Sequence, residues 1–362
     1  MNIRKRKKKQ IFVKNIAIGG NAPISIQSMT NTLTYKVDAT LKQIQELTDA
    51  GAEIIRLAVP TKKDTHALEK IIQSTNIPIV ADVHFHFERA IEAIEAGAHK
   101  IRLNPGNLRD KQKLKKVISA AKNANIPIRI GINAGSIRTA NELKKKITRE
   151  RLLNLIFKEL DSYVAFFEKN RFENLVLSAK SPSVTETIEI YRKLNKRYEY
   201  PLHLGLTHAG TIATGAIRSA SAIAILLAEG IGDTIRVSLS GEPTEEIFVA
   251  KEILSALDLR KFSSPELICC PTCGRCEVDL PKLASQIEKR LRNIHKPLKI
   301  AIMGCIVNGP GEAADANIAL IAGRDCGFIY VDGKRQERIK PRQFLHTLIK
   351  YIRQYEGNDD NE

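Results

Sequence analysis

Short apolar runs rich in β-branched residues recur through roughly the first 240 residues, and between them apolar residues take up helical spacing. The predicted strands are Pro23–Met29, Ile54–Val59, Pro78–Val83, Lys100–Pro105, Ile126–Asn133, Leu175–Lys180, Pro201–Thr207 and Thr234–Ser240. Helical spacing predicts helices that include Val37–Ala50, Phe87–Ala98, Lys111–Ala124, Ser219–Ala228 and Thr244–Leu257. Strands that alternate with helices across short connections are typical of parallel βαβ units.

The number of these units predicts the fold class, which is α/β. Eight units in about 250 residues match the size of a (β/α)8 TIM barrel, and a doubly wound open sheet is the alternative. One connection, Ala134–Glu173, is long and has helical patterning, which indicates an elaborated fifth unit. After Leu257 the pattern changes, and Lys261–Leu267 is predicted to be a linker. We therefore expect a barrel over residues 1–260 and a smaller α+β domain over residues 261–362.

Polar residues occur at a spacing of two inside the predicted strands, where apolar residues would be expected to fill a barrel. Five of them are cations, whereas one evident carboxylate, Asp82, accompanies them: Arg56, Arg102, Arg129, Lys180 and Arg236. Asn133, His203 and Ser238 follow the same pattern. Residues at the carboxyl ends of barrel strands line the active-site mouth, and guanidinium groups match phosphate oxygens bidentately. These residues are therefore predicted to bind a polyanion such as a diphosphate, with ion pairing as the structural alternative for any one of them.

Composition and charge agree with a polyanionic partner. The formal net charge is +17, from 57 basic and 40 acidic residues. Aromatic residues make up only 5% of the chain and Trp is absent, so stacking platforms for nucleic acid are few. No apolar run is long enough to span a membrane, and no apolar segment follows the basic residues Arg4–Lys9 as in a secretory signal. We expect a cytoplasmic protein that binds neither nucleic acid nor membrane.

All six cysteines lie between residues 269 and 326. Cys270 and Cys273 form a C-x-x-C pair, and Cys305 begins a loop rich in Gly and Pro. This clustering favours a metal site over a disulfide framework. The spacing leaves two metals open, because zinc could take His295 or Cys276 as a fourth ligand and an iron–sulfur cluster could use the same thiols.

Five motifs along the chain are those of a known family. They are Gln27–Thr32 (QSMTNT), Arg102–Asn107 (RLNPGN), Arg129–Ser136 (RIGINAGS), Cys270–Cys273 (CPTC) and Val307–Glu312 (VNGPGE). Together they resemble the bacterial, two-domain 4-hydroxy-3-methylbut-2-en-1-yl diphosphate synthases of the non-mevalonate isoprenoid pathway. The resemblance extends from about Ile11 to about Pro341, which is nearly the whole chain.

The resemblance implies a TIM barrel followed by a domain that carries a [4Fe-4S] cluster. The implied cluster ligands are Cys270, Cys273, Cys305 and the carboxylate of Glu312, which would also have a catalytic role. The implied reaction is the reductive ring opening and dehydroxylation of 2-C-methyl-D-erythritol 2,4-cyclodiphosphate, with ferredoxin or flavodoxin as the electron donor. The family has a catalytic glutamate after the seventh strand, where this chain has His208. Histidine can also deliver a proton, so His208 is the candidate acid.

Two other functional classes fit the sequence less well. A radical S-adenosylmethionine enzyme needs cysteines near the first strand, and none precedes Cys269. A zinc-ribbon protein that binds or modifies RNA is the alternative reading of the charge, but a second C-x-x-C pair is absent. Chain geometry also predicts a homodimer. The last barrel helix ends away from the site, so the cluster domain is expected to cap the barrel of a partner subunit, as the resemblance implies.

Overall fold

The structure is a computed structural model that describes residues 8–84, 86–105, 110–135, 148–207, 210–263, 265–291, 294, 296–307 and 309–357, apart from the side chains of Glu312 and Glu356. The chain divides into two compact units, Met1–Lys261 and Phe262–Glu362. Each unit has a sheet and a hydrophobic core of its own, and each is described by itself below.

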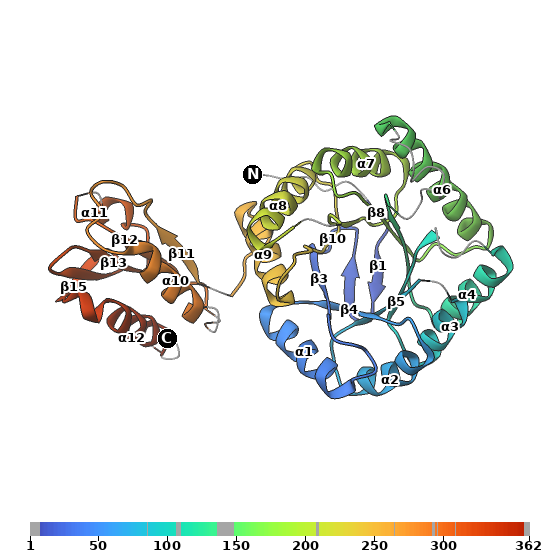
Figure 1. Cartoon of the computed structure of the whole chain (residues 1–362), viewed down its shortest axis with the longest axis horizontal. Helices are drawn as coiled ribbons and strands as arrows, with labels where there is room; N and C mark the ends of the chain where they lie inside the picture. Colours follow the sequence, from blue (N-terminus) through green and yellow to red (C-terminus); the bar gives the residue numbers. More distant parts are fainter. Residues whose placement is uncertain are drawn as a thin grey trace. The chain divides into compact units, whose positions relative to one another are not determined.

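The first unit is a barrel of parallel strands (Figure 1). Its strands are β3 (Ser25–Met29), β4 (Ile54–Ala58), β5 (Ile79–Val83), β6 (Lys100–Leu103), β7 (Ile128–Asn133), β8 (Leu175–Lys180), β9 (His203–Leu204) and β10 (Thr234–Ile235). They are hydrogen-bonded in the order β8-β7-β6-β5-β4-β3-β10-β9, and a parallel bridge between Leu177 and Leu202 joins β8 to β9. This order confirms the predicted TIM barrel and not the alternative, a doubly wound open sheet. The last two strands are shorter than the patterns predicted.

Helices surround this barrel because each strand is followed by an amphipathic segment (Figure 1). They are α1 (Val37–Ala50), α2 (Lys62–Gln73), α3 (Phe87–Glu95), α4 (Lys111–Asn123), α6 (Arg149–Lys169), α7 (Val184–Arg197), α8 (Ile212–Ala228) and α9 (Pro243–Ala256). Local signals set several of their starts: the Asp110 carboxylate accepts two backbone N–H groups at the start of α4, and Pro243 opens α9. Helix α6 shows that most of the described part of the long fifth connection is helical, as predicted.

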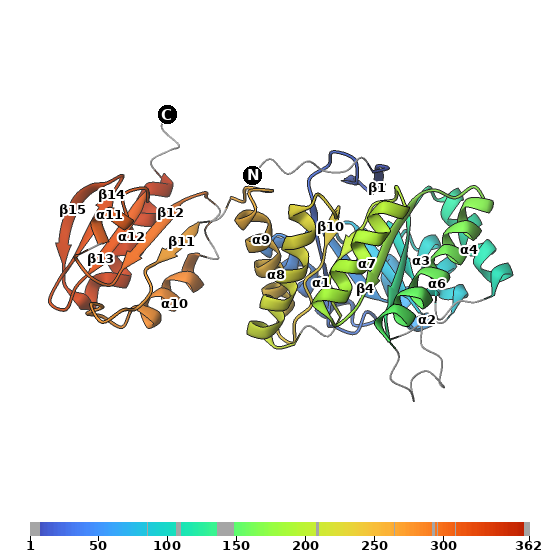
Figure 2. The same ribbon diagram turned by 90° about the horizontal axis from the view of Figure 1, so that it is seen from above.

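A short hairpin, β1 (Ile11–Val13) and β2 (Ile16–Ile18), was not predicted from the pattern. Its apolar side chains pack against Ile54, Val80 and Val176, which lie at the amino ends of barrel strands. Figure 2 shows β1 at one end of the barrel. An apolar plug therefore fills the amino end, and polar interior residues are left for the carboxyl end.

The second unit is a five-stranded mixed sheet with helices. Strands β11 (Glu266–Cys269), β12 (Lys299–Met303) and β13 (Ile318–Ala322) are parallel, and β14 (Gly327–Val331) and β15 (Lys334–Ile339) continue the sheet antiparallel. Helices α10 (Leu280–Leu291) and α12 (Phe344–Gly357) share a core with one face of the sheet, and α11 (Gly309–Glu312) follows β12. The prediction that the linker extends to Leu267 was wrong, because Glu266 and Leu267 pair with β12. No described helix is long and apolar enough to cross a membrane.

Candidate active site

A cavity of about 270 Å³ opens at the carboxyl end of the barrel strands. Its walls contain all five cations that the strand pattern singled out, together with Asp82, Asn133 and Ser238. The lining residues are Arg56, Asp82, His84, Arg102, Arg129, Gly131, Asn133, Ser178, Lys180, Leu206, Thr207, Arg236 and Ser238. The barrel thus brings together side chains from strands that are far apart in the sequence.

Strand register explains why these side chains meet. Asp82 on β5 lies opposite Arg102 on β6, and Arg102 lies opposite Arg129 on β7. Farther along, Asn133 on β7 lies opposite Lys180 on β8. Neighbouring residues in register point to the same side of a sheet, so a polar residue at each of these positions produces a continuous polar wall inside the barrel.

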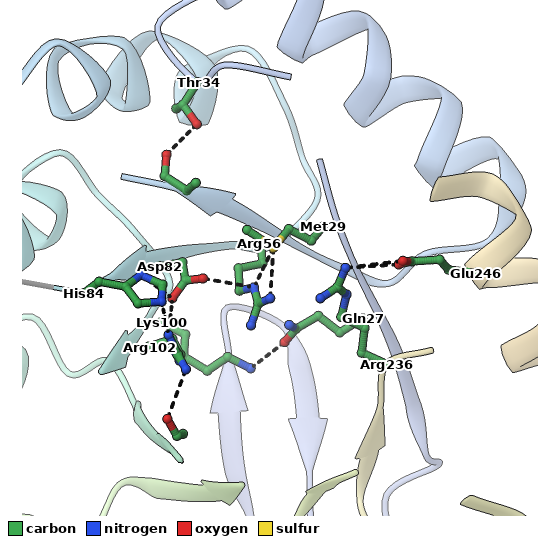
Figure 3. A network of polar contacts seen from close by, with 12 residues as sticks. Gln27, Met29, Thr34, Arg56, Asp82, His84, Lys100, Arg102, Arg236 and Glu246 are labelled. Atoms are coloured by element: carbon green, nitrogen blue, oxygen red, sulfur yellow. Dashed lines mark hydrogen bonds and ion pairs between the residues drawn. The ribbon is translucent and has the colours of Figure 1, made fainter. Parts of the chain in front are cut away.

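The Asp82 carboxylate organises one side of the cavity (Figure 3). Arg102 donates to it at 3.1 Å, and the Arg56 guanidinium lies 3.5 Å away. Arg102 also contacts the His84 ring at 2.6 Å and donates to the Gly131 carbonyl at 3.0 Å. Burial alone would raise the pKa of Asp82, but Arg56 and Arg102 outweigh it and hold this pKa well below its usual range. The carboxylate therefore stays ionised and fixes both guanidinium groups.

A second carboxylate, Glu246, accompanies the cations, so the expectation of a single carboxylate was wrong. Glu246 lies in the first turn of α9 and is only 6% exposed. It accepts from Arg236 Nη2 at 3.3 Å (Figure 3). It also accepts from the Leu239 backbone N–H at 3.0 Å. Its place in the helix that follows the eighth strand was a signal for this role, because βα connections line the mouth of a barrel.

Two of the cations have no counter-ion among the described residues. Nε and Nη1 of Arg129 are buried without a hydrogen-bond partner, and the Lys180 amino group makes neither a hydrogen bond nor an ion pair with any residue that the structure describes. Burial lowers the pKa of Arg129 well below its usual value, and the repulsion of Arg56 and Arg102 adds to this effect. Unpaired buried cations are unfavourable unless a ligand compensates them, so this part of the cavity is suited to an anion.

A polar layer lies beneath the cavity. His203 belongs to it rather than to the cavity wall: it is fully buried, and neither ring nitrogen has a partner. Burial lowers the pKa of His203 well below its usual value, and Arg129, Lys180 and Lys100 lower it further. Lys100 was missed by the sequence prediction, although it precedes Arg102 by two residues on β6. Its amino group lies 3.4 Å from Gln27 Oε1 and is fully buried (Figure 3).

The second unit places the cysteine loops side by side at the carboxyl ends of β11 and β12. The Gly304 N–H donates to Cys270 Sγ at 3.2 Å, which ties the loop that holds Cys273 to the loop that holds Cys305. The Cys273 thiol is exposed, and a hydrogen bond from the backbone of Arg275 lowers its pKa. Cys276 instead donates to the Val278 carbonyl at 3.3 Å and packs against the core.

These loops fit a metal centre in the chemistry of their donors. Soft thiolates from adjacent loops suit iron–sulfur clusters and zinc alike. Among the described side chains, no three His, Cys, Asp or Glu groups are gathered closely enough to hold a metal ion. The side chain of Glu312, all of His208 and all of His295 lie outside the described residues. Their predicted roles therefore stay predictions.

Comparison with known sequences gives the family. The GcpE TIM-barrel domain matches residues 8–251, and the GcpE protein C-terminal domain matches residues 266–354. A protein of Caldanaerobacter subterraneus named 4-hydroxy-3-methylbut-2-en-1-yl diphosphate synthase (flavodoxin) is 47% identical, over 95% of this chain and 96% of its own. Proteins with the same name from Lawsonia intracellularis and Clostridium perfringens are 47% and 45% identical, over 98% and 97% of this chain and 99% of each relative. The resemblance that the motifs indicated is confirmed, and the chain belongs to the GcpE family.

Proposed function

We propose that this chain is a 4-hydroxy-3-methylbut-2-en-1-yl diphosphate synthase whose substrate is 2-C-methyl-D-erythritol 2,4-cyclodiphosphate. The observation that carries this proposal is the cavity, where five cations meet while the two nearby carboxylates, Asp82 and Glu246, are already engaged by arginines. A cyclic diphosphate brings two negative charges and compensates this excess. The names of relatives that are 41–47% identical support the same activity.

The cavity residues have separate tasks in this proposal. Arg56 and Arg102 are held by Asp82, so their guanidinium groups meet the phosphates without first losing conformational freedom. Arg129, Lys180 and Arg236 supply the remaining positive charge. Asn133 and Ser238 offer the amide and hydroxyl groups that hydroxyls of the substrate require. His203 is fully buried and is not among the residues that line the cavity, so its predicted contact with the substrate stays a prediction.

The reaction needs two electrons, which form a carbon–carbon double bond, and one proton when the released phosphate oxygen stays ionised. One C–O bond to a ring phosphate breaks and leaves its electron pair on the phosphate oxygen, while one hydroxyl of the substrate takes up a proton and departs as water. Negative charge therefore develops on the phosphate inside a cavity rich in fixed cations, where it is stabilised without reorganisation. His208 is the proposed donor of a proton, in place of the glutamate of the family.

The electrons are proposed to arrive through the second unit. Cys270, Cys273 and Cys305 would hold a [4Fe-4S] cluster with Glu312 as the fourth ligand, and such a cluster supplies electrons one at a time. The hydrogen bond that joins the Cys270 and Cys305 loops and the lowered pKa of Cys273 support this ligand set. A flavodoxin, named with the relatives, or a ferredoxin would be the donor. We also propose a cytoplasmic homodimer in which each cluster domain caps the barrel of its partner.

The test is direct. Protein purified without oxygen should be brown and contain iron rather than zinc, and with reduced flavodoxin it should convert the cyclic diphosphate to the linear diphosphate. A zinc-loaded protein, or an iron-loaded protein that leaves the cyclic diphosphate unchanged with both flavodoxin and ferredoxin, would contradict the proposal.

A further inference from the structure

Lys180 stands apart from the other cations of the cavity. It ends β8, is only 7% exposed, and brings its amino group to the cavity wall with no acceptor among the described residues. Four guanidinium groups from different parts of the barrel interior repel it: Arg129 of β7, Arg236 after β10, Arg56 of β4 and Arg102 of β6. An amino group in this setting is a far better proton acceptor when an anion is present than when it is absent.

The carboxylates nearby do not relieve this repulsion. Asp82 of β5 is bound by Arg56 and Arg102, and Glu246 of α9 is bound by Arg236. His84, the remaining titratable residue among the described residues that line the wall, lies on the Asp82 and Arg102 side. Below, His203 of β9 faces Lys180, but burial and the surrounding cations lower its pKa, so it stays neutral.

Gly205, which follows β9, leaves room for the amino group. A Cβ at this position would lie 2.5 Å from Lys180 Nζ and 2.5 Å from the Arg236 carbonyl oxygen. Its φ of +155° is also one that side-chain-bearing residues rarely adopt. Glycine here leaves the space into which the buried Lys180 extends, and a side chain at this position would displace the amino group from the wall.

We propose that the cavity binds its polyanion together with a proton, and that the Lys180 amine accepts this proton. The inference rests on the proposed function for the identity of the polyanion. Without ligand, burial lowers the pKa of Lys180 well below its usual value, and the neighbouring arginines lower it further. Two phosphate charges at the wall reverse this repulsion and favour the ammonium form. The proton comes from bulk water and remains on Nζ in the complex.

The proton changes what Lys180 can do in the reaction. When the ring C–O bond breaks, the phosphate oxygen keeps the electron pair and gains one negative charge. An ammonium group charged at the binding step faces this oxygen, whereas the neutral amine would not stabilise it. The affinity then falls by at most about tenfold per pH unit between the lysine pKa of the free protein and that of the complex. Below this window Lys180 is charged in both states, and no proton is taken up.

The test is calorimetry of the oxidised holoenzyme, which has no electrons with which to turn over its substrate. Two ligands are compared, 2-C-methyl-D-erythritol 2,4-cyclodiphosphate and trimetaphosphate, because the acid groups of both stay ionised across the pH range used. Binding is measured in two buffers that differ in heat of protonation, so the difference in heat counts the protons taken up by the protein. We expect uptake to approach about one proton per site at its maximum.

Four variants identify the accepting group. Lys180→Arg should bind with no proton uptake and with an affinity that no longer falls with pH. Lys180→Met should bind more weakly and also without uptake. Lys193→Met, an exposed lysine on α7, should leave the uptake unchanged. Lys100→Met removes the deeper amine, and uptake should persist in it.

Several results would overturn the proposal: no uptake in the unmodified enzyme, no binding of either ligand, uptake that persists in Lys180→Arg, or uptake lost in Lys100→Met alone. Failure of the proposed function is distinct from these. Trimetaphosphate that binds with a proton in an enzyme inactive on the cyclic diphosphate supports the proton linkage and refutes the activity. Turnover of the cyclic diphosphate without proton uptake on binding supports the activity and refutes the proton linkage.

Discussion

Arg129→Met should make the protein more stable and the site weaker at the same time. Arg129 is 2% exposed, and both Nε and Nη1 are buried without a hydrogen-bond partner. Burial and the repulsion of the neighbouring cations outweigh the attraction of Asp82. The repelling groups are Arg56, Arg102 and Lys180. Its charge is therefore unfavourable in the ligand-free fold, and methionine fills similar space without a charge to desolvate.

The size of both effects follows from this setting. Replacing buried charged groups with apolar residues of similar volume stabilises a fold by about 1–4 kcal/mol, which corresponds to a rise in Tm of at least about 2 °C. A lost charge-assisted contact to phosphate removes about 1.5–3 kcal/mol of binding free energy, so the affinity for the cyclic diphosphate should fall by about 10- to 150-fold. The two changes have opposite signs because the protein compensates Arg129 only in part, through the attraction of Asp82, whereas the ligand would compensate it directly.

Calorimetric unfolding and ligand titration measure the two effects on the same sample. Arg102→Met is the matched control, because Arg102 has an ion-pair partner. This substitution leaves the buried Asp82 carboxylate with Arg56 and the His84 ring. That variant should lose stability, on the order of 3 kcal/mol, as well as affinity. An Arg129→Met protein that is destabilised like Arg102→Met, or that binds the ligand unchanged, would refute the assignment of Arg129 as a cation kept for the ligand.

Four further predictions test other parts of the molecule. The proposed thiolate ligands are Cys270, Cys273 and Cys305, and serine in place of any one of them should abolish iron loading, whereas Cys276→Ser should retain it. Full iron content in a variant of one proposed ligand would remove that residue from the ligand set. Gly205→Ala should weaken ligand binding by displacing the Lys180 amino group. Unchanged affinity in a folded variant would show that the cavity wall accommodates the added methyl group without displacing Lys180. The depressed pKa of Asp82 gives stability that is present above about pH 4, the pKa of an unfolded Asp, and is lost as the pH falls below it. Asp82→Asn should therefore flatten the acid side of the profile of Tm against pH. An unaltered profile would contradict this. Mixed dimers of an Arg129→Ala subunit and a Cys270→Ser subunit should regain activity if each cluster domain caps the partner barrel, whereas proven heterodimers that stay inactive would exclude that arrangement.

The sequence alone was sufficient for the barrel architecture and for the five cations that line the cavity. Parallel barrel strands are covered on both faces, so each one appears as a dense apolar run, and cations that interrupt such runs at a spacing of two must point into the barrel. For this reason the strand pattern places Arg102 and Arg129 in one cavity. The boundaries of β8 and α1 were also predicted correctly, since local patterns define them.

Tertiary structure decided which of these charges are already compensated. Glu246 reaches Arg236 from a helix, and Asp82 serves two arginines from neighbouring strands, so neither pairing can be derived from a single strand pattern. The depth of a residue along the barrel axis likewise could not be derived from the strand pattern. His203 shares the alternation of the cavity residues, yet it is fully buried and does not line the cavity. A periodic pattern determines the side of a strand on which a residue lies, and only the packed barrel determines which residues at that face reach a ligand.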